Sequence, residues 1–353
     1  MTSQDELAAG RASDPGRRPG TPSRGDPGRR ATVTKRLRTL ALRPEAGLPL
    51  ILVGLAVYLG FASEFFWRWK NLLNITEAVS VVGIAAAVLT VVVISGGLDL
   101  TPIAVITVTG IVITESLDVG VPIWAVVILA LLAAGAIGAL NGSLVAFLGL
   151  NAFIVTLGTT FLFTGVAFVV TDGTPQDVVN ESFNQLGQSK IWFDIPIDTV
   201  WMVAVFALTF CVLRFTRFGT HVFAVGGGES AARLGGVRVI RVKFAIYTLA
   251  GLVFGIAGIV QTANAGQVGI YAASSSNDLL TIIAAVIIGG TDLTGGLGSV
   301  IGTLVGIVLI GVIQNGLTLL NISSFWQPVV VGAILITAIV LDELRRRVQL
   351  AAA

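Results

Sequence analysis

Apolar runs of about twenty residues recur along this chain of 353 residues, from Leu48 to Leu341. A helix needs about 20 apolar residues to cross the hydrocarbon core of a bilayer. The chain is 54% hydrophobic and only 12% charged, whereas soluble domains contain about 25% charged residues. A soluble helical protein is disfavoured because soluble helices present a polar face, which most of these runs lack. The sequence therefore predicts an all-α integral membrane protein.

We predict about ten transmembrane helices, with both termini in the cytoplasm. Under this topology 19 of the 22 Lys and Arg residues lie in cytoplasmic segments: ten precede Leu48, six lie in 214–243 and three in 345–347. Such an excess is typical of cytoplasmic segments. The external loop 172–198 instead carries acids and has room for a short helix. The predicted spans are residues 47–63, 75–95, 102–117, 121–147, 152–171, 199–216, 244–262, 278–290, 298–317 and 325–341.

Three parts follow from this assignment: a tail (residues 1–45), a transmembrane domain (46–345) and a short cytoplasmic C-terminal end (346–353). The tail is rich in Arg, Pro, Gly and Ser, so it cannot bury a core and is expected to be disordered. A basic cytoplasmic tail that fixes orientation is favoured over an arm that binds nucleic acid.

Two interior turns share the pattern GGxDLT, 193 residues apart, which indicates an internal duplication. We expect the glycines to end one helix and the aspartate to cap the next, although either aspartate could instead contact an ion or substrate. Both turns are predicted to be cytoplasmic. Their residues are Gly96, Gly97 and Asp99, and Gly289, Gly290 and Asp292.

The predicted spans have no acidic or basic residue near their middle, which disfavours a proton- or ion-coupled pump. Short spans such as 278–290 point to a translocation path. Polar residues along such a path would serve a neutral solute, but each can equally form an interhelical hydrogen bond, the role we favour for any single one. The candidates are Asn141, Asn151, Thr156, Thr159, Gln261, Asn264, Gln314 and Asn315.

Catalytic motifs are not found in the sequence. No GxxxxGK[ST] occurs, which excludes a P-loop ATP site. With one cysteine (Cys211) and one histidine (His221), most metal sites and catalytic triads are excluded. We therefore expect no metal, no bound cofactor and no enzymatic activity in this chain.

Four stretches resemble the inner-membrane permeases of ATP-binding-cassette importers for monosaccharides (the ribose, xylose, arabinose and galactose group). The resemblance covers nearly everything after the tail and does not specify one sugar. The stretches are SGGLDLT at 95–101, LNGSLVAFLGLNAFIVTLGT at 140–159, GTHVFAVGGGESAARLGGVRV at 219–239 and AAVIIGGTDLTGGLGSVIGTLVGIVLIGVIQNGL at 284–317.

The resemblance implies a multi-pass permease of the bacterial plasma (inner) membrane that works as a homodimer or pseudo-dimer. It implies two cytoplasmic ATPase subunits, which bind ATP and Mg, and an extracytoplasmic binding protein that delivers the sugar. The alternatives are the same machine carrying a branched-chain amino acid or a nucleoside, or a free-standing channel or secondary carrier.

The basic loop 214–243 would then carry the helix that couples the ATPase to the spans. Gly226–Gly228 are expected to break the preceding structure, and Gly235 and Gly236 to end a short helix that starts at Glu229. So short a helix is marginal when isolated, and docking on a partner would hold it; a plain solvated basic loop is the alternative. The predicted coupling residues are Gly228, Glu229, Ala232, Arg233, Leu234 and Gly235.

Overall fold

The chain is almost entirely helical in a computed structural model that describes residues 44–268 and 272–323, and residues 325–330, 332–333, 336–337 and 340. The predicted tail, apart from its last two residues, and the predicted C-terminal end lie outside the described residues. The helices are α2 (Pro44–Ala62), α3 (Trp69–Ile94), α4 (Pro102–Asp118), α5 (Ile123–Ala146), α6 (Ala152–Thr171), α7 (Glu181–Gln188), α8 (Ile197–Phe215), α9 (Arg217–Gly227), α10 (Glu229–Leu234), α11 (Val239–Ala265), α12 (Ala272–Ile288) and α13 (Val300–Leu319).

Nine of the ten predicted spans coincide with helices in the described part of the chain. Six of these helices (α3, α5, α6, α8, α11 and α13) are long and apolar enough to cross a membrane. The tenth predicted span, 325–341, is described only in part, and its residues 326–330 are helical. One boundary differs in a way that matters: α3 begins at Trp69, six residues before the predicted span, so Asn71 and Asn74 lie inside the helix.

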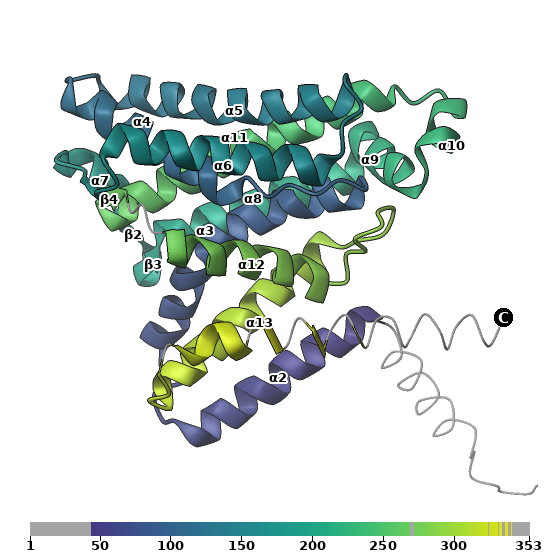
Figure 1. Cartoon of the computed structure of the whole chain (residues 1–353). Coiled ribbons are helices and arrows are strands. Elements are labelled where there is room, and N and C mark those ends of the chain that lie inside the picture. Colours follow the sequence, from purple (N-terminus) through teal and green to yellow (C-terminus); the bar gives the residue numbers. More distant parts are fainter. Residues whose placement is uncertain are drawn as a thin grey trace, which may run out of the picture. The chain divides into compact units, whose positions relative to one another are not determined.

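Helix α3 occupies the centre of the packed helices. Every residue from Gly83 to Ile94 is buried, and α3 contacts α8, α11, α12 and α13. Figure 1 shows α4, α5, α6 and α11 on one side of α3, and α12, α13 and α2 on the other. A helix that is apolar on all faces must be enclosed by other helices or by lipid, and for this half of α3 the enclosure is protein.

Helices α5 and α11 pack with their backbones in direct contact. Each carries a GxxxG motif, Gly138 and Gly142 in α5 and Gly251 and Gly255 in α11. A Cβ atom built on Gly251 would lie 2.5 Å from the carbonyl oxygen of Ala134 and 2.8 Å from the Cα of Gly138. Small residues of this spacing allow membrane helices to approach closely, so the glycines set the distance between these two helices.

The loops gather at the two ends of the helices (Figure 1). At one end, α7 is accompanied by η1 (Trp192–Asp194) and by two short strand pairs: β1 (Gln176–Asp177) with β4 (Gln267–Val268), and β2 (Lys190–Ile191) with β3 (Ile195–Pro196). Loop 172–198, which the sequence gives room for a short helix, contains one as α7. At the other end lie α9 and α10, on which the candidate site is built.

Candidate functional site

The segment between α8 and α11 folds as a helix, a break and a second helix. Helix α10 starts at Glu229 and ends at Leu234, with Gly235 as its C-cap, as the sequence predicts. The break before it is narrower than expected. Gly226 and Gly227 belong to α9, which the sequence analysis did not anticipate, and only Gly228, with φ of 157°, interrupts the chain.

Helix α10 is held to the rest of the chain by one ion pair and one buried side chain. Glu229 pairs with Lys243 in the first turns of α11, and Ala232 is buried against the core. Arg233 is exposed, and the side chain of Leu234 is 91% exposed. The helix therefore turns one face to the protein and leaves a basic and an apolar side chain free for another molecule.

The two GGxDLT turns have the same internal hydrogen bonds. Asp99 Oδ1 accepts from the backbone N–H of Thr101 at 2.8 Å, and Asp292 Oδ1 accepts from that of Thr294 at 2.9 Å; each aspartate also accepts from the hydroxyl of the same threonine. The sequence predicts that each aspartate caps the next helix, but neither aspartate is the N-cap residue. Both aspartates close a turn ahead of the helix, and α13 is capped by Ser299.

The helix-ending glycine differs between the two turns by one position. Gly96 (φ of 78°) follows α3, and Gly290 (φ of 84°) follows α12. Gly96 is the first glycine of its GGxDLT pattern and Gly290 is the second. The first turn therefore has one extra residue between its left-handed glycine and its aspartate.

Both turns meet the end of α9 at what we call the glycine junction: Ile94, Gly96, Gly226, Gly295 and Gly296. The backbone N–H of Gly296 donates to the carbonyl oxygen of Ile94 at 2.8 Å. Added Cβ atoms would collide there: one on Gly226 would lie 2.5 Å from the nitrogen of Gly296, and one on Gly295 would lie 2.7 Å from the Cα of Gly96. Three segments far apart in the sequence thus touch through bare backbone, two residues before the break that precedes α10.

Beyond the first turn, residues 97–101 continue as non-helical backbone among α5, α6 and α11. The carbonyl oxygen of Leu98 accepts from the hydroxyl of Tyr247 at 3.3 Å, and that of Leu100 accepts from the hydroxyl of Thr160 at 2.9 Å. Thr160 lies about 12 Å along α6 from its start at 1.5 Å per residue. Irregular backbone among membrane helices must have its polar groups satisfied within the protein or by a wet cavity, and here hydroxyl groups of two helices satisfy it.

Two candidate path residues lie beside this segment. Asn141 is fully buried, its Nδ2 donates to the hydroxyl of Thr101 at 3.4 Å, and its Oδ1 has no hydrogen-bond partner among the described residues. Thr156 is also buried and donates to the carbonyl oxygen of Ala152 at 2.8 Å, with Leu98 as a second, longer acceptor. Together with Asp99 they form a buried polar cluster.

Of the other path candidates, Thr159 is buried next to this cluster, with its hydroxyl 3.2 Å from the carbonyl oxygen of Thr156, and Asn264 donates to Asp198. The remaining four are not brought to the cluster. Asn151 caps α6 by accepting from Phe153 N and Ile154 N. Asn315 exchanges two hydrogen bonds with Asn71, of 3.1 and 2.8 Å, which join α13 to α3. Gln261 is exposed on α11, and Gln314 is half-buried on α13. Asn151 and Asn315 therefore have structural partners, the role that the sequence analysis favoured for any single candidate.

Several residues of this region were not singled out from the sequence. Tyr247 is a lone phenol in an apolar span, and such an isolated polar group indicates a specific hydrogen-bond partner. Lys243 was counted only as one of six basic residues, although it is the partner of Glu229. Gly295 and Gly296 follow the second GGxDLT turn directly, but a glycine pair does not indicate which distant segment it will touch.

Comparison with known proteins assigns this architecture to a family. The model of the family described as "Branched-chain amino acid transport system / permease component" matches residues 71–339. The chain belongs to this permease family. The ribose import permease protein RbsC of Escherichia coli (strain K12) is 35% identical to it, over 85% of this chain and 94% of that protein. The RbsC protein of Bacillus subtilis (strain 168) is 34% identical, over 88% and 96%, and the L-arabinose transport system permease protein AraH of E. coli (strain K12) is 34% identical, over 80% and 86%.

The permease is therefore a transport component and not an enzyme, and it is a multi-pass protein of the inner membrane. The match includes both GGxDLT turns, α10 and the whole glycine junction, since these lie between residues 94 and 296. The site described above consequently lies within the part of the chain that the family model matches.

Proposed function

We propose that this permease is the transmembrane subunit of an ATP-driven, binding-protein-dependent importer that carries a monosaccharide. The similarity to ribose and arabinose permeases over most of each chain supports the substrate class. The proposed assembly contains a second permease copy, cytoplasmic ATPase subunits that bind ATP and Mg, and an external sugar-binding protein. Its basic end, with α9 and α10, faces the cytoplasm, in keeping with the distribution of Lys and Arg.

We propose that α10 couples the ATPase to the membrane helices. The observation that supports this proposal is the glycine junction. Gly226 contacts both GGxDLT turns, and α10 follows after only two more residues. At the glycine junction the contacting atoms belong to the backbone. No flexible side chain can therefore adjust when α9 and α10 rotate or shift. Motion imposed on α10 by an ATPase would therefore move the ends of α3 and α12 together.

The proposed path uses the polar cluster around residues 97–101. Asn141 and Thr156 are the candidates that lie beside it, and Asn141 has an amide oxygen free to accept from a sugar hydroxyl. A neutral, hydroxyl-rich solute suits this cluster because its amide and hydroxyl groups can exchange hydrogen bonds with such a solute without a change in charge.

The first test asks whether transport depends on the position of α10 or on the charge of its residues. We expect Glu229→Lys to lower uptake by tenfold or more, because it replaces the ion pair with Lys243 by a repulsion and releases the start of α10. Stability should hardly change, since exposed ion pairs contribute about 0–1 kcal/mol. Uptake and thermal unfolding would be measured on the same preparations.

The double variant Glu229→Lys with Lys243→Glu supplies the matched control. It restores the pair with reversed polarity, so uptake should recover if the pair positions α10. Arg233→Glu, which changes an exposed residue of α10 that forms no ion pair among the described residues, should lower uptake without such rescue. Normal transport and ATPase association in all three variants would refute the coupling role.

The second test concerns the energy source and the substrate. In cells that express the permease with its partner subunits, uptake of labelled ribose or arabinose should stop when the ATPase cannot hydrolyse ATP. An uncoupler that removes the proton gradient while ATP is maintained should leave uptake nearly unchanged. Persistent uptake with the inactive ATPase would favour a secondary carrier or channel.

The description of the family model also names branched-chain amino acids, so this second substrate class is tested in the same assay. Excess unlabelled ribose, arabinose, leucine and a nucleoside would be compared as competitors of the labelled sugar. Competition by the pentoses alone supports the proposal. Transport of leucine or the nucleoside, with no pentose uptake, would assign the same machine to another solute.

A further inference from the structure

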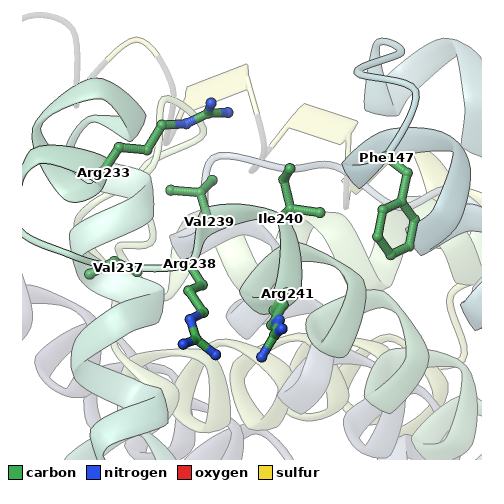
Figure 2. A pocket seen from close by; sticks show the side chains of 7 residues that line it. All are labelled: Phe147, Arg233, Val237, Arg238, Val239, Ile240 and Arg241. Carbon is green, nitrogen blue, oxygen red and sulfur yellow. The ribbon is translucent and has the colours of Figure 1, made fainter.

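A groove of about 400 Å³ lies beside α10, between the end of α5 and the start of α11 (Figure 2). Figure 2 shows the guanidinium groups of Arg238 and Arg241 extending in one direction, while that of Arg233 extends to the opposite side. The remaining lining is apolar. The groove is lined by Phe147, Arg233, Val237, Arg238, Val239, Ile240 and Arg241.

The positive charge of this groove is not compensated within the described part of the chain. The ion pair found there joins Lys243 to Glu229, and Arg238 and Arg241 are exposed and have no acidic partner among the described residues. Both arginines line the same groove, so an anion bound there would be attracted by both guanidinium groups. Guanidinium groups bind phosphate oxygens in a bidentate geometry.

The length of α11 places this groove at the level of the lipid headgroups. Helix α11 has 27 residues and is thus about 40 Å long, close to the thickness of a bilayer with its headgroup layers. Its charged residues lie in its first turns, and its long apolar stretch begins at Phe244. Arg238 and Arg241 therefore lie where the span leaves the hydrocarbon core.

The groove also exposes an aromatic side chain at the end of α5. Phe147 at the end of α5 is 61% exposed, whereas Ile240, which is 40% exposed, extends in Figure 2 away from the guanidinium groups of Arg238 and Arg241. Charged groups next to exposed apolar groups at the end of a span match a phospholipid, which presents a phosphate above an acyl chain. A protein partner would instead be expected on the side of α10 toward which Arg233 extends.

We propose that this groove binds an anionic phospholipid, with Arg238 and Arg241 at the headgroup phosphate and Phe147 along the first part of an acyl chain. Basic pockets between membrane helices are known to select anionic headgroups. This role is independent of the transported substrate, so it stands or falls separately from the proposed function.

Native mass spectrometry of the full-length permease, titrated with phosphatidylglycerol or phosphatidylcholine of the same acyl chains, would test the site. The wild type should prefer phosphatidylglycerol. In Arg238→Gln/Arg241→Gln the affinity for phosphatidylglycerol should fall about 10- to 30-fold, as expected for the loss of two basic residues near a membrane surface. The affinity for phosphatidylcholine should not change.

The variant Arg214→Gln/Arg217→Gln is the matched control, because it removes the same charge from the same basic segment outside the groove. It should keep the preference for phosphatidylglycerol. An equal loss in both variants would show diffuse attraction and overturn the site, as would an unchanged preference in Arg238→Gln/Arg241→Gln. If Arg238→Gln/Arg241→Gln lost the ATPase subunit but kept its preference for phosphatidylglycerol, the groove would be a protein interface, and the proposal would be overturned. Should the double variant fail to fold, Arg241→Gln alone should show about fivefold weaker binding.

Discussion

Replacing Gly251 with leucine should prevent α5 and α11 from packing and should yield little folded permease. A Cβ atom at this position already collides with the backbone of Ala134 and Gly138, and backbone atoms cannot rotate away as a side chain can. Overpacking of protein cores costs about 1–3 kcal/mol, and we expect the upper end of that range or more. In a bilayer no hydrophobic effect between helices offsets such a loss, since their association depends on close packing.

Gly158→Leu and Gly165→Leu in α6 are the matched controls. A Cβ atom at either position meets no atom within 4 Å, and leucine has a higher helix propensity than glycine by about 0.8 kcal/mol. These variants should be as stable as the wild type or slightly more so. Thermal unfolding in detergent, followed by size-exclusion chromatography, would compare them. Equal stability of Gly251→Leu and Gly158→Leu would show that the tight contact is not required.

The transmembrane helices could be predicted from the sequence because each is a local property of about twenty residues. An apolar run bounded by glycine, proline or charge defines a span without knowledge of its neighbours, and nine of the ten predicted spans are helices in the described part of the chain. The start of α3 was misplaced because Lys70, Asn71 and Asn74 make its first turns polar. Asn71 is retained there by its pair with Asn315, a contact across 244 residues that hydropathy cannot reveal.

The sequence predicted only those features of the candidate site that depend on neighbouring residues in the chain. The boundaries of α10 follow from the glycines at positions 228 and 235, and these boundaries are confirmed. The glycine junction was not predictable, because glycines have no side chain whose size, charge or polarity identifies a partner. Sequence alone indicates that a glycine permits an unusual backbone or a close approach. Whether Gly226 meets solvent, its own helix or the turns at Gly96 and Gly295 depends on how three separate helices pack.

Replacing Gly226 with alanine should abolish transport while leaving the spans folded. The added methyl group would collide with the carbonyl oxygen of Ile94 and lie 2.5 Å from the nitrogen of Gly296. It would therefore separate the two groups whose 2.8 Å hydrogen bond joins the GGxDLT turns. A buried donor left without its acceptor costs about 1–3 kcal/mol, enough to open the junction but too little to unfold a bundle of this size. We expect uptake to fall by at least tenfold, with normal insertion and a small decrease in the melting temperature.

The neighbouring substitution Gly227→Ala makes the decisive control. Gly227 lies in the same helix, but a Cβ atom there meets no atom within 4 Å, so alanine adds the same methyl group without touching the turns. Uptake and ATP hydrolysis by the assembled importer would be measured for both variants. If the junction transmits motion, Gly226→Ala hydrolyses ATP without transport, whereas Gly227→Ala transports normally. Equal uptake by the two variants would mean that α10 moves the spans through another contact, for which the ion pair between Glu229 and Lys243 is the candidate that the charge swap tests.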